Sequence, residues 1–103
     1  MTSVEPQIPR WLTHPEPVRV RIDECHWDPW GGEATVVITI GKQAFEALVP
    51  RHAITEDEIA GSTVRGIKIA ETDDNVYVAM PVSTITSPNL KVPKALQAQV
   101  FAA

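Results

Sequence analysis

Apolar and polar residues alternate with a period of two along the middle of the chain, the pattern of β-strands with one buried face. In residues 18–25, Val18, Val20 and Ile22 share one face and the residues between them are polar. Residues 34–40 are almost entirely β-branched, which favours a strand even more strongly. The same signals predict further strands at residues 43–49, 63–71 and 76–82.

Turn-forming residues separate these strands. Gly41-Lys42 divides residues 34–40 from residues 43–49, and this spacing predicts a hairpin. Pro29 and the two glycines that follow Trp30 end the first strand. The polar residues 72–75 form a second turn, before the last strand.

Two segments carry helix signals. Thr55 and Glu58 have the spacing of a capping box, and Gly61 is placed to end a helix of one or two turns. Near the C-terminus, Pro93 suits the first turn of a final helix that runs to about Phe101. The polar residues 83–92, interrupted by a proline, are expected to form the loop before that helix.

The order of these elements predicts a mostly β, small α+β fold. We expect a five-stranded antiparallel barrel or curled sheet, OB-like or SH3-like, because both barrels share this element order. One short helix lies between the third and fourth strands and another at the C-terminus. The prolines of residues 1–17 predict an extended arm, residues 18–82 form the barrel domain, and residues 83–103 pack on that domain as a loop and helix.

Composition narrows the class of protein. The chain has 103 residues, 44% of them hydrophobic and 21% charged, which is the balance of one folded domain. No apolar run approaches the ~20 residues of a membrane span, so no membrane partner is expected. The single cysteine excludes an internal disulfide and the first residues lack a signal-peptide pattern, so we expect a cytoplasmic location.

Candidate catalytic and metal-binding residues are few and badly spaced. Cys25 and His26 are adjacent, so on a strand they point to opposite faces and do not pair as nucleophile and base. His14, His26 and His52 lack the short spacings of zinc ligands. The carboxylates at residues 56–58 and 73–74 are expected to cap a helix and fill a turn. No phosphate loop is present, so we predict no catalytic residue, metal or cofactor, and a non-enzymatic protein.

The tryptophans are the strongest candidates for a binding surface. Trp27, Asp28 and Trp30 lie in the proline turn, and Trp11 lies on the arm. Tryptophan is enriched where proteins bind one another, although these three side chains could instead bury against the barrel and fill a small core. The leading hypothesis is therefore an interaction module of unknown process that binds a protein partner or a second copy of itself through these four residues.

The alternative hypothesis is an OB-like domain that binds single-stranded nucleic acid. Its site would be a basic strand face with an aromatic side chain for stacking. The residues concerned are Arg19, Arg21, Arg65, Lys68 and Tyr77, with Phe45 as a second aromatic candidate. Two observations oppose it. The net charge is −4, and Asp23, Glu46 and Glu71 lie on the same predicted strands, where they could pair with the basic residues.

Overall fold

The computed structural model describes residues 8–57, 61–81 and 89–102 of the chain. These segments contain nine β-strands, two 3₁₀ helices and one short α-helix. In chain order the elements are β1 (Arg10–Arg21), β2 (Glu24–Trp27), β3 (Glu33–Ile40), β4 (Gln43–Pro50), η1 (Arg51–Ala53), β5 (Ile54–Asp57), β6 (Gly61–Glu71), β7 (Asn75–Ala79), β8 (Asn89–Pro93), η2 (Lys94–Leu96), α1 (Gln97–Val100) and β9 (Phe101–Ala102).

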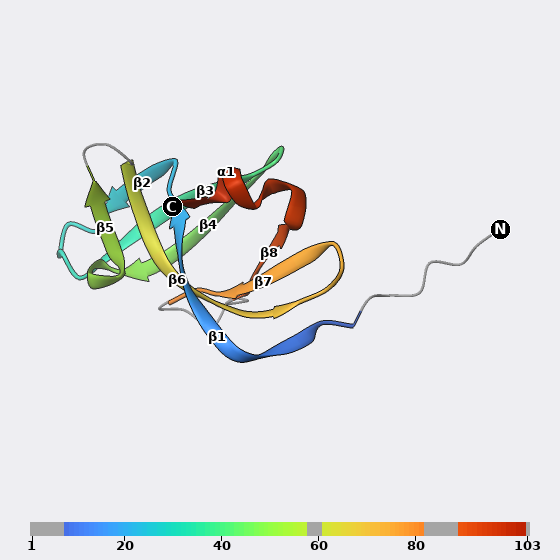
Figure 1. The fold of residues 1–103 in the computed structure, drawn as a ribbon. Helices are drawn as coiled ribbons and strands as arrows, with labels where there is room; N and C mark the ends of the chain where they lie inside the picture. Colours follow the sequence, from blue (N-terminus) through green and yellow to red (C-terminus); the bar gives the residue numbers. More distant parts are fainter. Residues whose placement is uncertain (1–7, 58–60, 82–88, 103) are drawn as a thin grey trace.

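The strands form two antiparallel sheets (Figure 1). The larger has six strands in the order β8-β7-β6-β1-β9, with β5 also paired to β6. The smaller has three, in the order β2-β3-β4. The fold is mostly β, and the larger sheet curls into a half-barrel.

Strand β6 changes its neighbour halfway along its length. Its first residues pair with β5 up to Val64, and from Ile67 onward it pairs with β7, while β1 follows it on the other side. Gly66 lies between these two stretches. A Cβ atom built on Gly66 would lie 2.6 Å from Cγ1 of Val78, closer than two such atoms can approach. Glycine therefore permits the close approach of β6 to its sheet neighbour β7 at this position.

One aliphatic core joins the two sheets. Alternate residues of β3 point inward, as the sequence pattern predicts, and meet the inward residues of β1, β6, β7 and β8. The buried hydrophobic cluster comprises Val20, Val36, Ile38, Ile40, Val49, Ala53, Val64, Val76, Val78, Met80, Leu90, Val92 and Val100. None of the six aromatic residues of the chain is fully buried.

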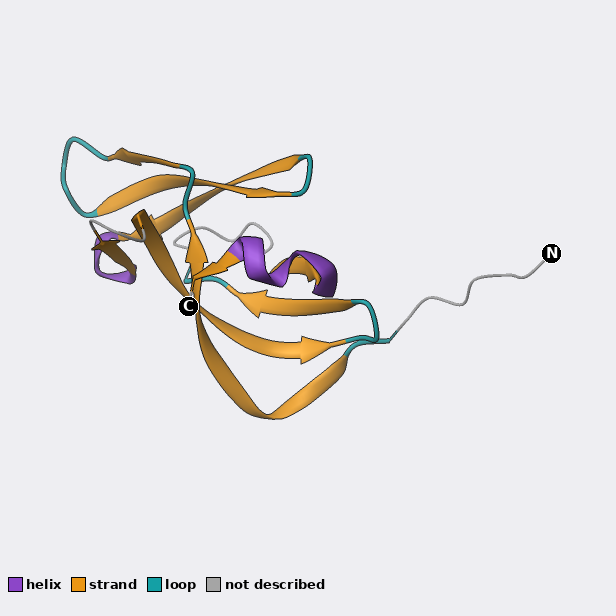
Figure 2. Ribbon diagram, turned by 45° about the horizontal axis from the view of Figure 1, so that its top comes forward, coloured by secondary structure: helices purple, strands orange, loops and turns teal. Residues whose placement is uncertain are grey.

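The C-terminal segment closes one end of the core. Helix α1 contacts β3 of the smaller sheet and β1 and β8 of the larger one, and Figure 2 shows it between the two sheets. Its last residue, Val100, is buried, and the chain then continues as β9 beside β1. The predicted terminal helix is thus present, although it is short and ends before Phe101.

The predicted hairpin of residues 34–40 and 43–49 is confirmed. Strands β3 and β4 pair over their whole length, and Gly41 has a φ of 63° at the turn between them. Such a positive φ is readily adopted by glycine. The inward stripe of the last predicted strand is also confirmed for Val76, Val78 and Met80, whereas Val82 lies outside the described residues.

The predicted helix that begins at Thr55 is wrong. Thr55 lies in β5, directly opposite Thr63 of β6, and among the described residues the nearby helical turn is η1, which precedes it. A short helix gains few hydrogen bonds for the cost of its first turn, whereas the edge of β6 offers a complete row of partners. Glu58, the other member of the capping pair, lies outside the described residues.

Three further expectations require correction, and two of them add a strand to the five expected. The expected loop at residues 83–92 contains the start of β8, because Leu90 and Val92 alternate into the core. Strand β1 begins at Arg10 rather than Val18, and a break in its register between Trp11 and Glu16 accommodates Pro15. The predicted strand 18–25 is two strands in different sheets, separated at Ile22 and Asp23.

Candidate functional site

The turn between β2 and β3 is fixed by hydrogen bonds that converge on Asp28. The amide of Gly31 donates to the Asp28 carbonyl at 2.9 Å, which closes a four-residue turn. The Asp28 side chain accepts a hydrogen bond from the amide of Trp30 at 3.1 Å, and the Asp28 amide donates to the carbonyl of Glu33 at 2.9 Å. Aspartate, proline and glycine in this order therefore give one defined turn conformation.

Arg51, which lies after β4 and outside the turn sequence, also forms hydrogen bonds to the turn. It follows β4, whose last residue pairs with Glu33 at the start of β3, and so it lies beside the turn. Its amide donates to the carbonyl of Gly32 at 3.1 Å and its guanidinium donates to that of Gly31 at 3.4 Å. The guanidinium also lies over the Trp27 ring, 4.7 Å from the ring centre, in a cation–π contact.

The turn exposes its second tryptophan almost completely. The exposed fraction is 91% for Trp30, 74% for Trp11 and 39% for Trp27. The interpretation that these side chains fill the core is therefore wrong. Trp11 lies on β1 of the larger sheet, opposite Ala70, and Figures 1 and 2 place that part of β1 far from the turn. Trp27, Asp28 and Trp30 are thus brought together, and Trp11 is not among them.

A pocket of about 470 Å³ lies beside the turn. Its acidic side is formed by Asp28 and Glu33, and one carboxylate oxygen of Glu33, Oε2, is buried without a hydrogen-bond partner among the described residues. A buried carboxylate oxygen in this state is unfavourable until a donor reaches it. The remaining lining residues are His26, Trp27, Pro29, Thr35 and Leu48.

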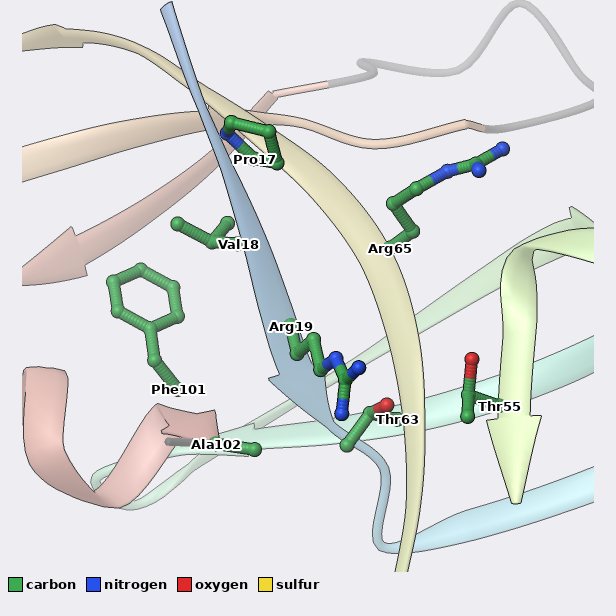
Figure 3. Close-up of a pocket in the computed structure, with 8 residues that line it drawn as sticks. All are labelled: Pro17, Val18, Arg19, Thr55, Thr63, Arg65, Phe101 and Ala102. Atoms are coloured by element: carbon green, nitrogen blue, oxygen red, sulfur yellow. The ribbon is translucent and has the colours of Figure 1, made fainter. Parts of the chain in front are cut away.

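A second pocket, of about 590 Å³, lies on the curled sheet where β1, β5, β6 and β9 meet (Figure 3). Arg19 and Arg65 face each other across β1 and β6 in direct register. Arg21 is two residues further along β1, and its Nε donates to the carbonyl of Phe101 at 3.4 Å. The lining residues are Pro17, Val18, Arg19, Thr55, Thr63, Arg65, Phe101 and Ala102.

The five residues of the nucleic-acid hypothesis do not form one surface. The three arginines lie together, but Lys68 is half-buried opposite Glu16 of β1. Tyr77 lies on β7, between Ala70 of β6 and Lys91 of β8. The expected neutralisation by neighbouring acids is not observed for Arg19 or Arg65. Asp23 accepts a hydrogen bond from the amide of Thr39 at 2.7 Å, and Glu71 pairs with Lys94 at 3.4 Å.

Cys25 and His26 are neighbours on β2, whereas His14 lies on β1 and His52 in η1. Cys25 is half-buried opposite Val36, and burial raises the pKa of its thiol, with a further contribution from the charge of Glu56. Nε2 of His26 lies 3.3 Å from a carboxylate oxygen of Glu24, its neighbour on the same strand. Across residues 8–57, 61–81 and 89–102, no three histidine, cysteine or acidic side chains gather in a group suited to a metal ion.

Sequence reasoning missed the residues that complete both sites. Arg51 at the turn and Thr55, Thr63 and Phe101 at the second pocket come from segments distant in the chain. Their positions depend on strand pairing, which no local pattern reveals. The basic character of Arg51, directly after Pro50, is the only local sign that a side chain could bind the turn.

Comparisons with protein-family models, with curated proteins and with solved structures find no significant match to this chain. Within the described residues, no helix is long and apolar enough to cross a membrane. The functional argument therefore depends on the geometry of the two sites.

Proposed function

We propose that this chain is a non-enzymatic interaction module that binds a protein partner, or a second copy of itself, through the turn from Trp27 to Gly32. The observation that carries this proposal is the 91% exposure of Trp30 on a turn held by defined hydrogen bonds. An indole left in water on an ordered turn gives a large apolar area that a partner can bury.

The order of the turn supports a binding role. Immobilising a flexible loop on binding costs free energy, and a contact site that is already ordered avoids much of this cost. Here Asp28 orders the turn from inside and Arg51 from outside. Trp30 is thereby presented as an anchor, with Trp27 beside it stacked on Arg51.

The pocket next to the turn supports a polar contact in the same interface. The buried Oε2 of Glu33 lacks a donor among the described residues, and Asp28 lines the same pocket. A partner that covers Trp30 and donates a hydrogen bond to Asp28 or Glu33 in this pocket would add a polar contact to the apolar anchor. An interface that combines an apolar anchor with a few satisfied polar groups is typical of specific protein binding.

The fold and location that go with this function are also proposals. We infer an OB-like or SH3-like relationship from the curled half-barrel and the short C-terminal helix. A cytoplasmic location is supported by the single cysteine, which is free and half-buried.

The test compares Trp30→Ala with Trp11→Ala, because both tryptophans are exposed and only one lies on the turn. We expect both variants to keep the free energy of unfolding within about 0.5 kcal/mol of the parent, as is usual for exposed positions. Trp30→Ala should weaken association by about tenfold or more, as removal of a binding hot spot does. Trp11→Ala should leave association unchanged.

Association is measured first as self-association by sedimentation equilibrium and then with partners captured by the immobilised parent protein. Equal association by the two variants would overturn the role of the turn. Unfolding of Trp30→Ala would show that this side chain supports the fold, and would equally count against the proposal.

A second candidate function is single-stranded nucleic-acid binding on the larger sheet. It is favoured by Arg19, Arg21 and Arg65, which lie together without Lys68 and Tyr77. Titration of a fluorescent octathymidylate at low salt, where the phosphate attraction is strongest, should show binding that falls steeply as salt is added. No binding at low salt would remove this function.

A further inference from the structure

The pocket on the curled sheet carries an inference independent of the turn. Arg19 of β1 and Arg65 of β6 occupy directly opposite register positions and both line the pocket, and Figure 3 shows their guanidinium groups pointing in different directions. We propose that this pocket binds the phosphate group of a small organic phosphate monoester. The argument uses the charge, the hydroxyl groups and the apolar wall of the pocket in turn.

Within the described part of the chain, the two arginines are a pair of like charges without a counter-ion. Like charges directly opposite each other on neighbouring strands destabilise a sheet. Neither guanidinium forms an ion pair with any described residue, and the described residues that line the pocket include no carboxylate. The molecule as a whole is acidic, with a net charge of −4. A bound dianion would remove this local repulsion.

Arginine is suited to the proposed ligand. Its planar guanidinium offers several N–H donors in a geometry that matches two oxygens of a phosphate. Figure 3 shows the Arg19 guanidinium beside Thr63 and the Arg65 side chain on the same side of β6 as Thr55. The Arg19 guanidinium is therefore accompanied by a hydroxyl group, whereas the Arg65 guanidinium points away from both threonines in this view.

The two threonines add neutral donors. Thr55 and Thr63 lie directly opposite each other on β5 and β6, and both line the pocket. A threonine hydroxyl donates one hydrogen bond, so the pair complements the guanidinium donors around an oxyanion. This pair exists only because residues 54–57 form a strand instead of the helix that the sequence predicts.

The other wall of the pocket is apolar. Pro17, Val18 and Phe101 line it, and Phe101 comes from β9 beside β1. The volume of about 590 Å³ lies within the range of small-molecule sites and exceeds the needs of a lone phosphate ion. The pocket therefore has room for an uncharged organic group joined to the phosphate, next to Pro17 and Ala102, which share the face of Arg19.

Phosphate reaches such a pocket from two sources, a free monoester or the backbone of a nucleic-acid strand. The second source coincides with the second candidate function, because both use Arg19 and Arg65. The experiment therefore titrates ¹⁵N-labelled protein with inorganic phosphate, adenosine 5′-monophosphate, uncharged adenosine and octathymidylate, and follows the backbone amide signals by NMR.

The matched variants are Arg65→Gln and Arg10→Gln. Both remove one positive charge, but Arg10 lies outside the pocket and pairs with Asp73 at 3.3 Å. For the parent we expect saturable shifts at Thr55, Thr63 and Phe101 with the monophosphate and none at these residues with adenosine. Arg65→Gln should weaken monophosphate binding about tenfold or more, as expected for loss of a charged hydrogen-bond donor. Arg10→Gln should bind like the parent.

The outcomes are distinct. Tighter binding of the monophosphate than of inorganic phosphate supports a monoester ligand. Octathymidylate binding that is much tighter than monophosphate binding replaces the monoester with a strand as the ligand. The absence of pocket shifts with every phosphate probe, or equal affinities for the two variants, overturns the site. If Arg65→Gln loses its dispersed spectrum, Arg19→Gln provides the same comparison.

Discussion

At the scale of single residues, Gly66 sets how closely two strands of the larger sheet pass. Its missing side chain leaves the space that Cγ1 of Val78 occupies, and a Cβ atom there would also lie 3.4 Å from the carbonyl oxygen of Ala79. Gly32, by contrast, has no atom within 4 Å of the equivalent position. A substitution to alanine would therefore place a methyl group in packed surroundings at Gly66 and in open space at Gly32.

We predict that Gly66→Ala lowers the free energy of unfolding by about 2 kcal/mol, the usual range for forcing an extra carbon into a packed core. Gly32→Ala should change it by less than about 0.5 kcal/mol. Urea denaturation followed by far-ultraviolet circular dichroism measures both values. If the two variants are equally stable, β6 is free to move away from β7 and the close approach does not constrain the fold.

Residue chemistry also explains which parts of the candidate sites the sequence could reveal. The turn around Asp28 was predictable because proline, glycine and aspartate act within a few positions of one another. The hydrogen bonds from Arg51 to that turn were not predictable, since they depend on the pairing of β4 with β3. The exposure of Trp30 was likewise undecided, because tryptophan is common both in cores and in interfaces.

At the scale of elements, the predictions succeeded where the signal was local. In the β3–β4 hairpin, the β-branched residues of β3, the apolar alternation of β4 and the turn at Gly41 all predict the same structure. The prediction for the segment that forms β5 was wrong, because its local sequence favours a helix while the edge of β6 offers a strand partner. Strand β8 was missed for a similar reason, since only Leu90 and Val92 mark it within polar surroundings.

At the scale of the whole molecule, the first and last strands of the described chain pair with each other. Strand β1 pairs with β6 along its length and with β9 near its end. Val100 precedes β9, is 2% exposed, and belongs to the core cluster that both sheets share. Because these pairings join distant parts of the sequence, the C-terminal segment is expected to contribute to the stability of the entire fold.

We predict that Val100→Ala lowers the free energy of unfolding by about 2 kcal/mol, from the loss of two buried methyl groups and the cavity that remains. The exposed neighbour Gln99→Ala serves as the control and should change stability by less than about 0.5 kcal/mol. Urea unfolding is followed at amides of both sheets by NMR. We expect one shared midpoint; separate midpoints would show that the sheets unfold independently and would contradict a common core.

The absence of a buried aromatic ring has an optical consequence. With Trp30 and Trp11 so exposed, the intrinsic fluorescence of the free protein should resemble that of indole in water, and unfolding should alter its emission wavelength little. Burial of Trp30 by a partner would move that emission toward the blue. The side chain proposed as the contact anchor therefore also reports on binding: its emission wavelength should shift when a complex forms and change little when the protein unfolds.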